Sequence, residues 1–404
     1  MSEIRCGGRL HRCVIVCLGC LVGAACQGCK SPKSHEVGVS ETDASIPAQN
    51  QATETAGNQA LEMQGQAPAP PMRTPRNPSV GTASGSNGSA DAQRASDAGS
   101  MTADAVDMDA ASADVPDSPL SVAGLQPTQI QKNMRFGLAE GPLWDPCKHA
   151  LLFADVTANV IYSLSTDDEI AVFARDTNNT NGFAFAPDGS LVLAQMAPPG
   201  HLARLDPSGQ ITTLDTGPTA LHTPDDVTVG SDGTIFFSDG EFPPIGSINL
   251  GSLPVYALAP GASALEKLGT VGGPNGIELS PDEQTLYVNA YFEGSVIPFK
   301  RGPDGKLTKG KALITGLSNP DSMCLDAAGN LYVAVTSGLQ VISPEGKRIG
   351  LIPVRSTQGT TNCTFGGDDG KTLYITTWTS LWKVTGMPIA GLDWQVNRER
   401  LGCK

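Results

Sequence analysis

One phrase returns six times in this chain and restricts its possible folds more than any other feature. Each copy has a polar corner, a short apolar run, a turn rich in Asp, Gly and Pro, and a second apolar run. The copies are EGPLWDPCKHALLFADV, TNGFAFAPDGSLVLAQM, PDDVTVGSDGTIFFSDG, PNGIELSPDEQTLYVNAY, PDSMCLDAAGNLYVAVT and TNCTFGGDDGKTLYITTW. Further strand-like runs lie between them, and the turns recur about every 40 to 50 residues.

A four-stranded unit with this period is typical of a propeller blade, so the sequence predicts an all-β, six-bladed β-propeller. We expect this domain to occupy residues 123–398. Alternating apolar residues favour strands, and no stretch of the region shows a long helical period. The alternative is a β-sandwich or two stacked β-domains, which the sixfold repeat of one corner phrase disfavours.

The corners place one polar residue at the same position of every copy. Equivalent positions of a propeller share one height around its axis, so six oxygen-bearing side chains are expected to converge at the mouth of the central channel. These corner residues are Glu140, Asn181, Asp225, Asn275, Asp321 and Asn362. Asn and Asp are also ordinary turn residues, and that interpretation stays open for Asn181 and Asn362.

The chemistry of the corner residues indicates a cation. Carboxylates that converge repel one another unless a positive charge neutralises them. Carboxylate and amide oxygens without His or Cys favour one hard divalent cation, Ca²⁺ before Mg²⁺, with Mn²⁺ and Zn²⁺ as further candidates. Zinc more often takes His or Cys ligands, and the histidines His149, His201 and His222 lie away from the corner position.

Four ordered phrases carry a resemblance to a known family. They are EGPLW at residues 140–144, PNG at 274–276, PDSMCLD at 320–326 and TNCTFGG at 361–367. Together they resemble the senescence-marker-protein/gluconolactonase/regucalcin-like family over essentially the whole folded part. The resemblance implies a six-bladed propeller with a divalent metal in its channel, in a family that includes lactone hydrolases.

The family's site residues carry over position by position. The resemblance implies that Glu140, Asn275 and Asp321 are metal ligands. A fourth family position, commonly Asn, is Asp225 here, which adds a negative charge beside the metal. Thr223 stands where some members carry an Arg that contacts substrate, so the resemblance does not extend to sugar-acid specificity. Asp225, Asn181 and Thr223 are the expected substrate-binding residues.

The folded part contains no Gly-x-Ser-x-Gly elbow, His-Glu-x-x-His motif or phosphate-binding Gly loop. We therefore expect a gluconolactonase-like, metal-dependent hydrolase of a small lactone or ester, with the cation as Lewis acid. Asp321 is the expected general base, and Asp225 is its rival. The alternatives are an organophosphate or ester hydrolase on the same site, and a non-catalytic, calcium-containing binding propeller.

The N-terminus predicts export. Three arginines precede the apolar run CVIVCLGCLVGAAC, which is typical of a secretory signal and short for a membrane span. Cys26 follows Gly23, Ala24 and Ala25, as at a bacterial lipoprotein cleavage site. We expect residues 1–30 to be a signal or lipoprotein segment, so that the protein is tethered to a bacterial membrane by an N-terminal lipid or is periplasmic or secreted. An uncleaved anchor is the alternative.

Residues 31–122 contain no Phe, Tyr or Trp and are rich in Ala, Ser, Gly, Pro and Asp. Such a composition cannot bury enough apolar area to offset the entropy of ordering, so it predicts a disordered low-complexity linker. A linker of this kind suits a domain held away from a membrane surface. The oligomeric state is not indicated by the sequence.

Six of the ten cysteines fall within residues 1–30. The folded part keeps Cys147, Cys324, Cys363 and Cys403, which an exported protein could pair in a way that the sequence leaves open. The net charge is −14, and residues from Gln126 onward hold 28 Asp and Glu against 19 Lys and Arg. This acidic balance argues against a nucleic-acid partner and suits a bound cation.

Overall fold

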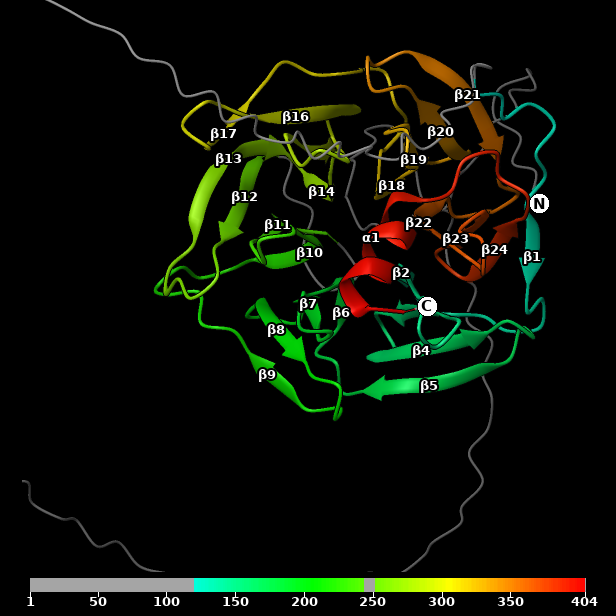
Figure 1. The fold of residues 1–404 in the computed structure, drawn as a ribbon, viewed down its shortest axis with the longest axis horizontal. Helices are drawn as coiled ribbons and strands as arrows, with labels where there is room; N and C mark the ends of the chain where they lie inside the picture. Colours follow the sequence, from blue (N-terminus) through cyan, green and yellow to red (C-terminus); the bar gives the residue numbers. More distant parts are fainter. Residues whose placement is uncertain (1–119, 243–250, 404) are drawn as a thin grey trace, which may run out of the picture. The chain divides into compact units, whose positions relative to one another are not determined.

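The computed structural model describes residues 120–242 and 251–403, which belong to one unit spanning residues 103–404. Within these residues, 24 strands form six four-stranded antiparallel sheets arranged as blades around a central axis (Figure 1). The prediction of an all-β, six-bladed propeller is confirmed. The expected segment 1–30, and the expected linker up to residue 119, lie outside the described residues.

Blades 1 to 3 follow one another along the chain, each running from its inner to its outer strand. Blade 1 contains β2 (Ala139–Asp145), β3 (Ala150–Asp155), β4 (Val160–Ser165) and β5 (Ile170–Arg175). Blade 2 contains β6 (Thr180–Phe185), β7 (Leu191–Gln195), β8 (His201–Leu205) and β9 (Ile211–Thr213). Blade 3 contains β10 (Thr223–Val229), β11 (Ile235–Gly240), β12 (Ser252–Leu258) and β13 (Glu266–Gly272).

Blades 4 and 5 repeat this order, and blade 6 closes the ring with strands from both ends of the domain. Blade 4 contains β14 (Pro274–Leu279), β15 (Thr285–Ala290), β16 (Ser295–Arg301) and β17 (Leu307–Lys309). Blade 5 contains β18 (Met323–Leu325), β19 (Leu331–Val335), β20 (Gly338–Ile342) and β21 (Arg348–Pro353). Blade 6 contains β22 (Thr360–Gly366), β23 (Thr372–Thr377), β24 (Ser380–Val384) and, as its outer strand, β1 (Thr128–Ile130).

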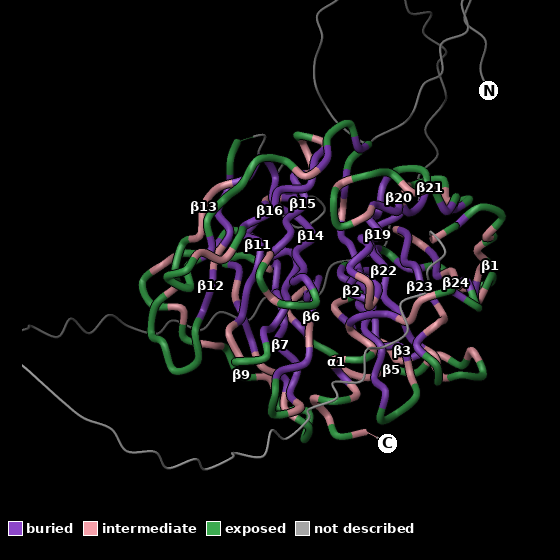
Figure 2. Tube along the Cα trace, turned by 45° about the horizontal axis from the view of Figure 1, so that its top comes forward, coloured by how far each residue is buried: buried purple, intermediate pink, exposed green. Residues whose placement is uncertain are grey.

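The hydrophobic core is divided into six wedges, one between each pair of neighbouring blades. Between blades 6 and 1, for example, Trp144 stacks on Tyr374 with ring centroids 5.6 Å apart. The inner strands are buried on both faces, whereas outer strands such as β5 and β9 are largely exposed (Figure 2). Each blade is therefore held by its two neighbours, which explains why the ring has to close.

One helix, α1 (Leu392–Leu401), follows the last blade and lies over the centre of the ring in Figure 1. The sequence did not predict it, because LDWQVNRERL lacks an apolar stripe with a helical period. Tertiary contacts hold it instead: the indole nitrogen of Trp394 donates to the carbonyl oxygen of Gly367, 2.8 Å away. Gly402 ends the helix in the left-handed conformation, at φ 65°. Among the described residues, no helix is long and apolar enough to cross a membrane.

Candidate functional site

The structure places all six corner residues at the beginnings of the inner strands. Five lie in the first three residues of β2, β6, β10, β14 and β22, and Asp321 lies two residues before β18. Because inner strands of a propeller run side by side around the axis, these positions form one layer at one mouth of the channel. The repeated corner position of the sequence therefore forms a ring of side chains around the channel axis.

A β-bulge accompanies every corner residue. In β10, for example, the register shifts between Pro224 and Val227, so that one extra residue opposes β11. Equivalent shifts occur in β2, β6, β14 and β22, and in blade 5 both Asp321 and Ser322 hydrogen-bond with Ala334. A bulge re-aims a side chain that would otherwise alternate in and out of the sheet. Apart from the polar corner itself, no feature of the sequence predicted these bulges.

Small residues after the corners let neighbouring inner strands approach closely. A Cβ on Gly141 would lie 2.3 Å from the carbonyl oxygen of Asn181, and a Cβ on Gly276 would lie 2.8 Å from that of Asp321. Hydrogen bonds cross these close approaches, because the amide of Gly276 donates to the Asp321 carbonyl oxygen at 3.1 Å. The amide of Ser322 likewise donates to the Thr361 carbonyl oxygen at 2.9 Å. The ring is therefore fixed by backbone contacts between blades.

Three of the corner carboxylates interact with one another. Burial, and then the carboxylates of Asp321, Asp225 and Asp226, raise the pKa of Glu140 well above its usual range. Burial, Asp321 and Asp226 do the same to the pKa of Asp225. Glu140 and Asp225 are buried, whereas Asp321 keeps partial exposure to solvent. The structure thus gathers acidic groups from blades 1, 3 and 5 in a place that disfavours negative charge.

Asn275 joins this group from blade 4. Burial raises the pKa of Asp321 to about 8, and a hydrogen bond from the Asn275 side chain partly offsets that rise. The Oδ1 atom of Asn275 is buried and has no hydrogen-bond partner among the described residues. An unpaired buried carbonyl oxygen beside buried carboxylates is costly unless a donor or a cation reaches it.

The other predicted residues are engaged elsewhere. The Nδ2 atom of Asn181 points to the sulfur of Met196 at 3.4 Å, and the Oδ1 atom of Asn362 accepts the amide of Cys363 at 2.7 Å. Glu140 makes the same kind of contact, because its Oε2 atom accepts the amide of Gly141 at 3.2 Å. The hydroxyl of Thr223 donates to the Gly240 carbonyl oxygen at 2.6 Å, so it is occupied within blade 3.

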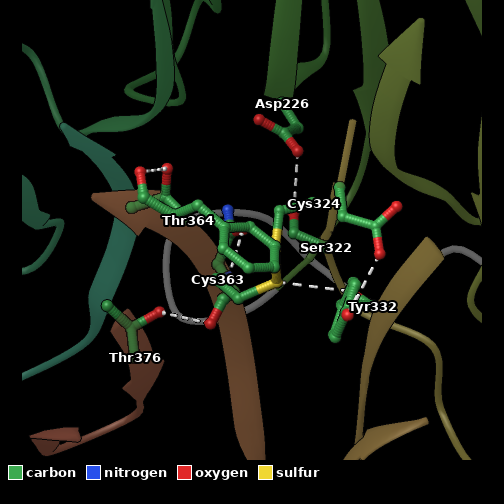
Figure 3. Close-up of a disulfide and its surroundings, with 10 residues drawn as sticks. Asp226, Ser322, Cys324, Tyr332, Cys363, Thr364 and Thr376 are labelled. Carbon is green, nitrogen blue, oxygen red and sulfur yellow. Dashed lines mark hydrogen bonds between the residues drawn. A yellow bond between two sulfur atoms is a disulfide. The ribbon is translucent and has the colours of Figure 1, made fainter. Parts of the chain in front are cut away.

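Asp226, which the sequence analysis did not select, ties three blades together. Its Oδ2 atom accepts the Ser322 hydroxyl at 2.8 Å and the Ile277 amide at 3.4 Å, while Oδ1 accepts the Val227 amide at 2.9 Å (Figure 3). Burial raises the pKa of Asp226 to about 6, and these three hydrogen bonds oppose the rise. The signal in the sequence was the second Asp of the TPDDV corner, at the position that is small in the other copies.

The opposite end of the channel is covered by α1. The Arg400 guanidinium donates to the carbonyl oxygens of Phe185 and Val229, at the ends of β6 and β10, at 2.6 and 2.9 Å. A cavity of about 70 Å³ lies between the helix and the inner strands, with Asp226, Glu278 and Asp393 among the residues that line it. Among the described residues, α1 therefore covers the end of the channel opposite the corner residues.

Two disulfides settle the pairing that the sequence left open. Cys324 pairs with Cys363 and joins the inner strands of blades 5 and 6 beside Tyr332 (Figure 3). Cys147 pairs with Cys403 across 256 residues and fastens the end of α1 to blade 1. The first disulfide is adjacent to the corner residue Asn362 and three residues from Asp321, so it stiffens the ring itself.

Residues 138–379 match the SMP-30/Gluconolactonase/LRE-like region, which is more than half of the chain. The protein belongs to the SMP-30/gluconolactonase/LRE-like family. This confirms the resemblance drawn from the corner phrases. The match ends before α1, so the helix that covers the channel lies beyond the family region.

The proteins similar to this chain include gluconolactonases and regucalcins. The chain is 27% identical to a gluconolactonase of Zymomonas mobilis over 275 residues, which cover 59% of this chain and 75% of the relative. It is 26% identical to regucalcin of Gallus gallus over 301 residues, which cover 64% and 94%. A solved gluconolactonase of Xanthomonas campestris aligns with a TM-score of 0.57 and 27% identity, covering 67% and 98%.

The residues of this SMP-30/gluconolactonase/LRE-like member fit a divalent cation by their chemistry. Asn275 offers an unpaired carbonyl oxygen, and three corner carboxylates lie in a buried layer. In residues 120–242 and 251–403, no three His, Cys, Asp or Glu side chains form a group that could hold a metal by themselves. A cation held here would therefore need the amide oxygen of Asn275 beside the carboxylates, and the ligand set stays a prediction.

Proposed function

We propose that the protein is a lactonase that uses a divalent cation held at the corner residues. The observation that carries this proposal is the meeting of Glu140, Asp225 and Asp321 with the unpaired Oδ1 atom of Asn275. They meet at one end of the channel of a propeller whose family includes gluconolactonases. Blades 1, 3, 4 and 5 each contribute one of these side chains.

Glu140, Asp225, Asn275 and Asp321 would hold the cation, with Ca²⁺ preferred because all the donors are oxygen atoms. When bound, such a cation neutralises the buried carboxylates and polarises the carbonyl group of a lactone as a Lewis acid. Asp225 distinguishes this chain, because its carboxylate adds a charge where relatives commonly present an amide. That extra charge strengthens attraction for a hard cation.

Asp321 is the proposed general base. Asp321 is the one residue of the three that is not fully buried, and burial of its carboxyl group raises its pKa to about 8. Its carboxylate takes a proton from a water molecule while the water oxygen adds to the lactone carbonyl carbon. The ring C–O bond then breaks, the proton passes to the released alkoxide oxygen, and a hydroxy acid leaves.

The test combines metal analysis with a substrate panel. Mass spectrometry of the purified protein should find about one divalent ion per chain, and a pH-stat should record acid release from lactones with Ca²⁺, Mg²⁺, Mn²⁺ or Zn²⁺ present. An aryl ester and a fluorophosphate in the same panel test the ester and organophosphate alternatives. If the metal binds and none of these compounds is hydrolysed, the lactonase proposal is rejected in favour of a calcium-containing binding propeller.

We further propose that the protein is exported, either tethered by an N-terminal lipid or released outside the cytoplasm. The two disulfides support this proposal, because disulfides persist in oxidising compartments. Radiolabelled palmitate and a Cys26→Ser variant test the tether. Label that enters the native protein and is lost from the variant supports lipidation at Cys26, whereas an unlabelled protein in the soluble exported fraction supports plain secretion.

A further inference from the structure

The residues that leave the second strand of each blade lie directly outside the corner residues. Each second strand runs antiparallel to its inner strand, so Thr223 pairs with Gly240 and Pro274 pairs with Ala290. In blades 2, 3, 4 and 6 one or both of the next two residues are apolar, and these apolar residues share one hydrophobic cluster with the residue before β2. We call these residues the apolar rim: Leu138, Met196, Phe242, Tyr291, Phe292 and Trp378.

Three aromatic rings make up the largest part of the rim. The ring centroids of Phe242 and Tyr291 lie 5.4 Å apart, those of Phe242 and Phe292 5.7 Å, and those of Tyr291 and Phe292 5.3 Å. Edge-to-face and tilted arrangements at these distances are favourable. Phe242 is buried, whereas Tyr291 and Phe292 each keep an accessible part. The rings therefore form a rigid wall with an open side.

This wall stands next to the proposed metal ligands. A Cβ on Gly240 would lie 2.3 Å from the Phe242 ring and 2.8 Å from the carbonyl oxygen of Pro274, the residue before Asn275. The phenol of Tyr291 is close enough to Asp321 and Asp225 for their carboxylates to raise its pKa, after the larger effect of burial. A molecule held at the corner residues would thus contact the aromatic wall with the part that points towards blades 3 and 4.

Several polar groups on this side are occupied, although Asn289 Oδ1 and Ser295 Oγ in blade 4 have no hydrogen-bond partner among the described residues. The Thr223 hydroxyl donates to the Gly240 carbonyl oxygen, and the Asn181 amide points to the Met196 sulfur. His222 and Glu241 lie beside the wall and face each other, with Nδ1 and Oε1 3.3 Å apart. A sugar lactone carries several hydroxyl groups, each of which needs a partner when it leaves water. Phe242 and Phe292, which make up most of the wall, offer no such partner.

We infer that the substrate is a lactone with an apolar substituent that packs on Phe242, Tyr291 and Phe292, and not a polyhydroxylated sugar lactone. This inference rests on the proposed lactonase function and specifies its substrate class. Burial of methylene groups in a hydrophobic site discriminates substrates by about 10-fold or more.

The experiment compares three lactones and two variants of the full chain. The lactones are δ-decalactone, which carries a pentyl chain, unsubstituted δ-valerolactone and glucono-δ-lactone. We expect kcat/KM for δ-decalactone to exceed that for glucono-δ-lactone by at least 10-fold. Phe292→Ala should lower kcat/KM for δ-decalactone at least 10-fold. It should also reduce the ratio of kcat/KM for δ-decalactone to kcat/KM for δ-valerolactone. Phe173→Ala, on the outer strand of blade 1, is the matched control and should keep the wild-type ranking.

Binding of inert lactams separates this inference from the lactonase proposal. Calorimetric titration with the pentyl-substituted δ-lactam, the unsubstituted δ-lactam and gluconolactam requires no turnover. Suppose that no lactone is hydrolysed, that the pentyl lactam binds at least 10-fold more tightly than gluconolactam, and that Phe292→Ala removes this difference in affinity. The inference about the apolar rim is then supported, although the lactonase proposal fails. A preference for the gluconate compounds in either assay overturns it, as does a pentyl preference that Phe292→Ala leaves intact.

Discussion

Asp226 shows how a single carboxylate can set the spacing of a site without belonging to it. It accepts hydrogen bonds from the residues that follow Asn275 and Asp321, in blades 4 and 5, while it stands beside Asp225 in blade 3. Hydrogen bonds to a charged group contribute about 1.5–3 kcal/mol each. Asp226 is therefore a positioning residue for three of the four proposed ligands.

Replacing Asp226 tests this role. Asp226→Ala should lower kcat/KM about 100-fold, because the Ser322 hydroxyl and the Ile277 amide lose their acceptor, at about 1.5–3 kcal/mol for each bond. Asp226→Asn keeps one acceptor oxygen and should lose about 10-fold. Calcium affinity, measured by calorimetry, should fall in the same order as kcat/KM. If Asp226→Ala lowers only the melting temperature, Asp226 is a structural residue and nothing more.

Asp321 and Asp225 differ in exposure, and that difference predicts different roles. Asp321→Asn keeps an oxygen donor but removes the base, so kcat should fall by about 10²–10⁴ while calcium affinity changes far less. Asp225→Asn restores the side chain common in relatives and should keep turnover, with a changed ranking among lactones. Steady-state kinetics and calcium titration on both variants show which of the two carboxylates acts as the general base. An active Asp321→Asn variant beside an inactive Asp225→Asn variant would reverse the assignment.

At the scale of elements, α1 places an acidic group in a buried position at the end of the channel. Burial raises the pKa of Asp393 to about 6, and Arg400 only partly counteracts this. A raised pKa means that the folded state binds the proton more tightly than the unfolded chain does. The stabilising effect of protonated Asp393 is complete near pH 4 and below, and it is lost as the pH rises through about 6.

Asp393→Asn should therefore stabilise the protein at pH 8 and change little at pH 4. One kcal/mol corresponds to about 2–4 °C in a domain of this size, and we expect a gain of that order at pH 8. Differential scanning calorimetry of the metal-free variant and the metal-free wild type at both pH values measures how the Asp393 carboxyl group changes the melting temperature. An equal shift at both pH values would show that the ionisation of Asp393 is not its cause.

The segment before β1 also contributes to the fold, although its composition did not predict this. Val122, on the linker side of the expected boundary at residue 123, is 3% exposed and packs in the wedge between blades 5 and 6. A Cβ on Gly350 would lie 2.6 Å from its Cγ2 atom. The segment from Leu120 to Leu125 thus covers the outer side of that wedge.

Two truncations measure this contribution. A chain that starts at Leu120 should keep the melting temperature of the full protein, while a chain that starts at Gln126 should fold but melt about 5 °C lower. The second change removes a buried Val, whose burial stabilises by about 1.5–3 kcal/mol. Equal melting temperatures for the two chains would place the true start of the domain at Gln126.

At the scale of the whole molecule, the six blades depend on one another through the ring of corner residues. Glu140, Asp225 and Asp321 come from different blades, and their mutual repulsion acts on the whole ring when no cation is present. Added Ca²⁺ should raise the melting temperature in proportion to the logarithm of its concentration above the dissociation constant. A chelator should lower it to the metal-free value.

Asn275→Ala is the matched control for that experiment, since it removes the unpaired oxygen and keeps all three carboxylates. Its melting temperature without metal should fall slightly, because the hydrogen bond from the Asn275 side chain to Asp321 is lost, and its response to Ca²⁺ should begin at a concentration at least 10-fold higher than in the wild type. A response to Ca²⁺ that is the same in both proteins would remove Asn275 from the donor set.

The propeller and the positions of its corner residues could be predicted from the sequence, because both follow from local repetition. A strand, a turn and a second strand are encoded within each copy, and six similar copies can close only into a ring. The oxygen chemistry of the corners also followed from residue type alone. Glu140, Asn275 and Asp321 needed no knowledge of distances to be proposed as ligands.

Only the tertiary structure decided which of the six corners act together. The Asn362 side chain accepts the amide of Cys363 and the Asn181 side chain contacts the Met196 sulfur, although both residues occupy the same position of the repeat as the proposed ligands. The sequence likewise did not predict the role of Asp226, the pairing of the cysteines, the position of α1 over the channel or the apolar rim. Each depends on how closely two blades approach, and that distance is set by glycine contacts and by the wedges packed between blades, which join residues far apart in the chain.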